Sequence, residues 1–104
     1  MKALFIGLIG VASVLATGNA AAQAKGEEVY KKACSVCHDK GIAGAPKHGD
    51  KKAWEPLIKQ GLDALYTVSI KGKPGTGMVA KGGNASLSDA DVKAAVDFMV
   101  SKAK

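Results

Sequence analysis

The residues most able to do chemistry are two cysteines and a histidine in the run Cys34-Ser35-Val36-Cys37-His38. On a helix, positions three and four apart share a face, so both thiols and the imidazole can reach one side of the same ligand. The thiols can form thioether links to the two vinyl groups of a haem, and the imidazole can bind its iron. The run therefore predicts one covalently attached haem c per chain, with Cys34 and Cys37 as attachment sites and His38 as an axial ligand.

A Cys-x-x-Cys pair also occurs in thioredoxin-like redox proteins, in zinc sites and as a plain disulfide. A structural zinc site usually needs four ligands, whereas this chain has no third cysteine and only one further histidine, His48. A thioredoxin-like pair belongs to an alternation of strands and helices, and no strand-like run follows Cys37. These features favour the haem over its alternatives.

A second axial ligand can come from the segment 71–84, which contains five glycines and Met78. Ordering such a loop costs conformational entropy and buries little surface, so we expect the loop to have a use. We predict that the Met78 sulfur is the sixth iron ligand, on the side opposite His38. The rival Met99 is expected in the core of the last helix. The rival His48 is expected to be solvent-exposed or bonded to a haem propionate.

The residues around this site are expected to be helical, which makes the fold class all-α with three to four main helices around one haem. The first helix is expected over 26–37 and the third over 62–70. A stretch over 50–61 begins at an Asp50 N-cap, and Pro56 predicts a break or restart near Glu55. The last helix follows a capping box at Ser88 and should cross the first helix.

Two further residues are expected to support the haem. The loop over 39–50 should present a backbone carbonyl to the free ring nitrogen of His38, and Pro46 is the candidate for setting that geometry, although it can equally serve to end a turn. Trp54, the single tryptophan, is expected either in the haem pocket, with its indole donor directed towards a propionate, or as an ordinary core aromatic.

The first 24 residues resemble an export signal. Lys2 precedes an apolar run over 3–16, and small residues follow up to Ala24. Cleavage after Ala22 or Ala24 is favoured over an uncleaved anchor, because the strongly apolar part is shorter than the roughly 20 residues of a spanning helix. The segment contains no cysteine, so a lipid anchor attached through a cysteine is excluded. We therefore expect a signal peptide over 1–24 and one domain over 25–104, located in the periplasm.

The expected domain is small and basic. It carries fourteen lysines, no arginine and nine acidic residues, a formal charge of +5. An exported protein without arginine is a poor candidate for binding nucleic acid. Lysines around a haem edge instead predict steering towards acidic redox proteins or membrane electron-transfer complexes, although a merely solvated surface explains any single lysine equally well. Eighty residues bury a modest core, so the haem should also support folding.

Several motifs together resemble the class I c-type cytochromes, and among these the small bacterial cytochrome c5 group. They are the run 34–38, Gly44-Ala45-Pro46, Trp54, the stretch 77–84 and the Leu87-Ser88-Asp89 entry to the last helix. The resemblance implies a small cytochrome c-like fold, His38 and Met78 as axial ligands, Pro46 as the carbonyl partner of His38, and a helix crossing at Gly26, Tyr30 and Phe98. Members of the c5 group often carry a second cysteine pair, where this chain has Asn84 and Leu87.

The predicted function is one-electron transfer by a monomer that is not an enzyme and has no small-molecule substrate. Filling both axial positions with protein leaves iron no open site for a reactant. Two alternatives stay open. A haem-based sensor or peroxidase-like enzyme would need Met78 to be displaceable, and a periplasmic thiol oxidoreductase would use Cys34 and Cys37 without haem.

Overall fold

The computed structural model describes residue 21 and residues 23–104 of the chain. Residues 1–20 and 22 of the expected signal peptide lie outside these residues, whereas Ala24, one of its two expected cleavage points, lies in the first helical run. The described part consists of helices and loops, which confirms the all-α class. No helix within it combines the length and apolarity needed to cross a membrane.

The first helical run carries the two cysteines and the histidine. It is α-helical over 23–29, continues as a π-helical turn, η1 (Tyr30–Cys34), and ends as α2 (Ser35–His38). The N–H of Ser35 donates to the carbonyl of Tyr30, five residues back, which is the π-helical bond. The sequence pattern predicted the extent of this run but not its π-helical turn.

Three more helices complete the fold: α3 (Lys51–Lys59), α4 (Leu62–Lys71) and α5 (Asp89–Ala103). Short 3-10 turns, η2 (Ile42–Gly44) and η3 (Ala80–Gly83), lie in the loops. The N-cap at Asp50 is confirmed, because its carboxylate accepts from the Ala53 N–H at 3.3 Å. The predicted break near Glu55 is wrong, since α3 continues through Pro56. Pro56 and Lys52, whose carbonyl loses its N–H donor, are both exposed, so water can solvate that carbonyl.

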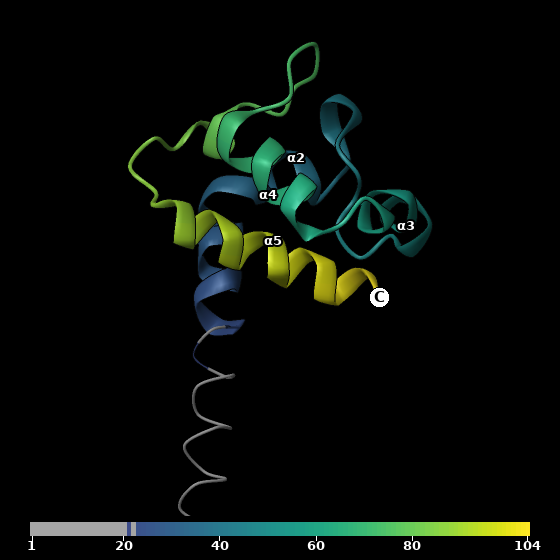
Figure 1. The fold of residues 1–104 in the computed structure, drawn as a ribbon, viewed down its shortest axis with the longest axis horizontal. Coiled ribbons are helices and arrows are strands. Elements are labelled where there is room, and N and C mark those ends of the chain that lie inside the picture. The colour runs from purple at the N-terminus through teal and green to yellow at the C-terminus, as the bar shows by residue number, and fades with distance from the viewer. Residues whose placement is uncertain (1–20, 22) are drawn as a thin grey trace, which may run out of the picture.

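Helix α5 organises the core. Its capping box at Ser88 and Asp91 is formed in both directions, as predicted. In Figure 1, α5 crosses the first helical run, and it also contacts α3 and α4. At the crossing, a Cβ on Gly26 would lie 2.4 Å from the Ala94 carbonyl oxygen and 3.0 Å from the Phe98 Cβ, so only glycine permits this approach. The crossing expected at Gly26, Tyr30 and Phe98 is therefore present.

The buried core follows the inner face of α5 and the side chains that meet it. Met99 is only 3% exposed, as expected of a core methionine. The core residues are Val29, Tyr30, Trp54, Leu65, Leu87, Val92, Ala95, Val96, Met99, Val100 and Ala103.

Candidate functional site

A cavity of about 760 Å³ lies beside α2 and brings together residues far apart in the sequence. Cys34, Cys37 and His38 line it from the first helical run, and Met78 lines it from the glycine-rich loop. Trp54 of α3 and Pro46 of the intervening loop also contribute. The volume falls within the range of about 300–1,000 Å³ that is typical of cofactor sites. All six residues singled out from the sequence thus border one space.

His38 is held in one orientation and one tautomer. Its side chain is buried, with 7% exposed, and Nδ1 lies 2.9 Å from the Pro46 carbonyl oxygen. A carbonyl can only accept, so Nδ1 is the protonated nitrogen and donates this bond. The lone pair is then on Nε2, which is the tautomer that a metal-binding histidine needs. The contact expected between the loop and His38 is therefore present, with Pro46 as the acceptor.

Trp54 supports the same wall of the cavity. Its ring centroid lies 5.9 Å from that of His38, and its side chain is buried. The indole Nε1 donates to the Lys47 carbonyl at 2.9 Å. Trp54 was expected either in the haem pocket, with this donor towards a propionate, or as a core aromatic; it belongs to the buried core, lines the cavity, and uses the donor to fix the loop that carries Pro46. Trp54 thus stabilises the histidine side of the cavity through a backbone contact.

Both cysteines are unpaired and half-buried at the cavity wall. Burial raises the pKa of the Cys34 thiol to about 11. A thiol of this kind is a poor nucleophile near neutral pH, because the reactive form is the thiolate. Among the described residues, no three histidine, cysteine or acidic side chains cluster in a way that could hold a metal ion. Within the described residues the pair therefore lacks the partners of a zinc site, and Cys34 lacks the lowered pKa of a thiol-redox nucleophile.

The loop that carries Met78 is fixed at several points. The Lys73 N–H donates to the Met78 carbonyl at 2.8 Å, and the Met78 N–H donates to the Thr76 hydroxyl at 3.2 Å. Further along, Gly82 has a φ of +62° and packs so closely that a Cβ there would lie 2.1 Å from the Ala33 carbonyl oxygen. The loop thus lies directly against the helical run that carries the cysteines.

The remaining lining is mostly apolar, which suits a flat, hydrophobic macrocycle with two thioether links, one nitrogen ligand and one sulfur ligand. A ring of this kind would bury its apolar surface against the aliphatic walls. These walls are formed by Val36, Ile42, Ala43, Ala53, Leu57, Leu65, Val68 and Val79.

His48 does not line the cavity. Its ring centroid lies 5.5 Å from that of Phe98, in a stacked arrangement, and 4.5 Å from that of Tyr30. Its backbone N–H donates to the His38 carbonyl at 2.7 Å. It is half-buried, so neither a ligand role nor an exposed position describes it, and it contributes to packing at the helix crossing.

Two positions near the cavity were not predicted from the sequence. Gly82 permits the contact between the methionine loop and Ala33, and the Gly82-Gly83 pair was its only sequence signal. Lys81 has a left-handed backbone, with φ +55°. Its ammonium donates to the Leu87 carbonyl and forms an ion pair with Asp89 at the start of α5. Its only sequence signal was its place in the stretch 77–84, which resembles the class I c-type cytochromes.

Comparison with known proteins gives consistent matches over the domain. The sequence model of the family described as cytochrome C oxidase, cbb3-type, subunit III matches residues 21–99. Cytochrome c-555 of Chlorobaculum tepidum is 52% identical over 101 residues, covering 93% of both chains. Cytochrome c5 of Azotobacter vinelandii is 41% identical over 76 residues, covering 71% of this chain and 89% of the relative.

A solved structure is also similar. It is described as "Crystal structure of electron transfer complex of nitrite reductase with cytochrome c", and one of its chains matches with a TM-score of 0.71 and 46% sequence identity. The match covers 77% of this chain and 95% of that chain. Sequence and fold therefore point to the same group of proteins.

Proposed function

Since this chain belongs to the class I c-type cytochromes, within the family described as cytochrome C oxidase, cbb3-type, subunit III, we propose that it is a one-electron carrier with one covalent haem c. One observation carries the proposal. A single cavity is lined at once by Cys34, Cys37, His38 and Met78. These are the side chains that attachment and two-sided ligation of a haem require.

Each residue has a distinct proposed role. Cys34 and Cys37 would hold the haem through two thioether bonds, each formed when a thiol S–H adds across a vinyl group. Nε2 of His38, with Nδ1 held by the Pro46 carbonyl, would supply one iron ligand. The Met78 sulfur would supply the second. When bound, the haem supplies an iron that alternates between the ferric and ferrous states.

Electron transfer fits this site better than catalysis at iron does. Two protein ligands leave no coordination position for a substrate, and a methionine ligand in an apolar pocket favours the ferrous state. A haem-based sensor or peroxidase-like enzyme would need Met78 to leave readily, yet bonds to Thr76 and Lys73 hold the backbone of Met78 within its loop, and the loop packs against Ala33 at Gly82. A thiol oxidoreductase is disfavoured by the buried Cys34 thiol with its raised pKa.

We further propose that the protein acts in the periplasm after removal of residues 1–24. The charge and apolarity pattern of that segment supports export, and the family match begins at residue 21. Its partners would be acidic redox proteins or membrane electron-transfer complexes. The formal charge of +5 on 25–104 supports this choice, as does the likeness to a cytochrome c solved in an electron transfer complex with nitrite reductase.

Visible spectra of the purified protein test the haem and its ligands. We expect a ferrous spectrum of haem c type, a colour that stays on the chain after denaturation, and a weak far-red sulfur-to-iron band in the oxidised protein. Met78→Ala should abolish the far-red band and open the iron to added imidazole. Met99→Ala is the matched control and should keep the band, because Met99 lies in the core.

The proposal does not survive if protein made in a host competent for haem attachment is colourless. It is also wrong about the ligand set if Met78→Ala leaves the oxidised spectrum unchanged. Retention of the band in Met99→Ala shows that the loss in Met78→Ala reports the ligand rather than general destabilisation.

A further inference from the structure

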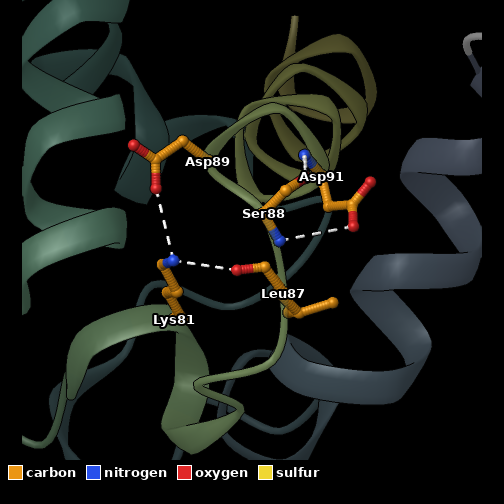
Figure 2. Close-up of polar contacts among 5 residues, drawn as sticks. All are labelled: Lys81, Leu87, Ser88, Asp89 and Asp91. Atoms are coloured by element: carbon orange, nitrogen blue, oxygen red, sulfur yellow. Dashed lines mark hydrogen bonds and ion pairs between the residues drawn. The ribbon is translucent and has the colours of Figure 1, made fainter.

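Lys81 differs from the other lysines of the described residues, because its ammonium both donates to a backbone carbonyl and forms an ion pair. Its Nζ donates to the Leu87 carbonyl at 2.8 Å and lies 3.3 Å from a carboxylate oxygen of Asp89, as Figure 2 shows. The Lys81 side chain is only 22% exposed, whereas the other lysines in ion pairs have at least half of their side chains exposed. A charged hydrogen bond in such a sheltered position is stronger than an ordinary surface ion pair.

The groups that Lys81 contacts stand at the beginning of α5, the helix that contributes most of the buried core residues. Leu87 is buried, and Ser88 and Asp91 form the capping box that fixes the first turn. Figure 2 shows Lys81 reaching this point from η3, a turn within the loop 71–84 that also carries Met78. The ammonium therefore joins a loop to a rigid element.

The backbone of Lys81 adds to the case. Its φ of +55° and ψ of +30° place it in the left-handed region, which costs free energy for any residue with a Cβ. The next two residues, Gly82 and Gly83, are also left-handed and incur no such cost. A lysine in this position is strained, and its side-chain bonds to the start of α5 are what offsets the strain.

Lys81 also lies beside Met78. Both residues border a small gap of about 10 Å³ against Val92 and Val96 of α5. Such a gap is at the lower limit for holding one water, so the packing behind Met78 is close. Movement of Lys81 away from α5 would remove part of the wall against which Met78 rests.

We propose that Lys81 is a positioning residue for Met78: it ties the methionine loop to α5 and so keeps the sulfur at the iron. This inference rests on the proposed function, in which Met78 is the sixth ligand. Added imidazole competes for that position and binds only when the loop opens. Its apparent dissociation constant therefore equals the intrinsic constant divided by the open fraction.

The experiment measures imidazole binding to the oxidised holoprotein. Lys81→Met, which keeps the apolar stem and removes the ammonium, should bind imidazole about five- to tenfold more tightly, because a lost charged hydrogen bond raises the open fraction. Lys81→Arg should restore affinity to within about twofold, since guanidinium can donate to the same carbonyl. Lys59→Met is the matched control: its ion pair with Glu55 has the same 3.3 Å distance but is exposed and distant from the loop.

Lys81→Gly provides a second variant, because it removes the ammonium while relieving the left-handed strain, and so folds even if Lys81→Met does not. Suppose that the wild type shows the far-red band but the Lys81 variants that fold bind imidazole with unchanged affinity. This result overturns the positioning role of Lys81 and leaves the proposed ligation by Met78 standing. A similar increase in Lys59→Met also overturns that role. A wild type without the far-red band overturns both this inference and the proposed ligation, because there is then no methionine ligand to position.

Discussion

Single residues at this site are fixed by backbone contacts more than by other side chains. His38 and Trp54 both donate to carbonyls of the same loop, at Pro46 and Lys47. Because a carbonyl can only accept a hydrogen bond, this arrangement sets the tautomer of the neutral imidazole of His38. On the opposite side, Gly82 performs the comparable task by allowing the methionine loop to touch Ala33.

Replacing Gly82 tests that contact, and Gly83 offers a matched control. Both glycines have positive φ, but a Cβ on Gly83 would meet only the Val79 side chain at 3.8 Å. Gly83→Ala should therefore lower the free energy of unfolding by about 1–2 kcal/mol through backbone strain alone. Gly82→Ala should cost a further 1–3 kcal/mol, roughly the range for overpacking, because the Ala33 carbonyl must move. Denaturant unfolding of the oxidised holoproteins, followed by haem absorbance, gives both values, and equal losses would contradict the proposed contact.

At the scale of elements, the sequence predicted what depends on local pattern. The extent of α4, the capping box of α5 and the Cys-x-x-Cys-His run were all readable, because periodicity and capping act within a few residues. The continuity of α3 through Pro56, the π-helical turn and the engagement of Lys81 were not. Pro56 is tolerated because the Lys52 carbonyl is exposed to water, and Lys81 reaches Leu87 and Asp89 only because the chain turns back at η3; helical periodicity encodes neither feature.

Helices α4 and α5 are joined by a bond that depends on pH. The Tyr66 hydroxyl donates to the Asp97 carboxylate. This bond, together with burial, raises the pKa of Tyr66 from 10.0 to about 12. The folded protein thus holds the phenol proton more tightly than the unfolded chain does. The resulting stabilisation is complete below pH 10 and is lost as the pH rises towards 12.

Tyr66→Phe should abolish this contribution. The free energy of unfolding of the wild type should fall more steeply than that of the variant as the pH rises through about 10 to 12, and the two curves should converge. Urea unfolding at a series of pH values measures the difference, in which the titration of lysines and of Tyr30 cancels. Parallel curves would show that the bond contributes no differential stability.

At the scale of the whole molecule, the cavity is large for the chain that surrounds it. The cavity has a volume of about 760 Å³ and mostly apolar walls, and the expected domain has only 80 residues. Without a bound apolar group these walls would face water, and a small domain has little stability to spare for that exposure. The proposed haem is therefore expected to act as the centre of the core as well as the redox group.

Preventing haem attachment should consequently unfold the protein. A Cys34→Ala/Cys37→Ala double variant is expected to lose most of its helical circular dichroism and its cooperative thermal transition. Ser35→Ala is the control, because Ser35 lies between the two cysteines and its side chain makes only an exposed bond to the Lys31 carbonyl. This variant should retain the helical circular dichroism and the cooperative transition. A double variant that is colourless yet unfolds cooperatively would show that the polypeptide supports its fold alone.

The π-helical turn has a consequence for how one helix serves two neighbours. A turn of this kind accommodates one residue more than an α-helical turn, so side chains after it are rotated by about 100° relative to those before it. Before the turn, Gly26 meets α5; after it, Cys37 and His38 meet the cavity. The widened turn therefore sets the angle between these two interfaces. Deleting one of the residues 31–33 would rotate Cys37 and His38 away from the cavity, while Gly26 and Tyr30 would keep their places at the crossing.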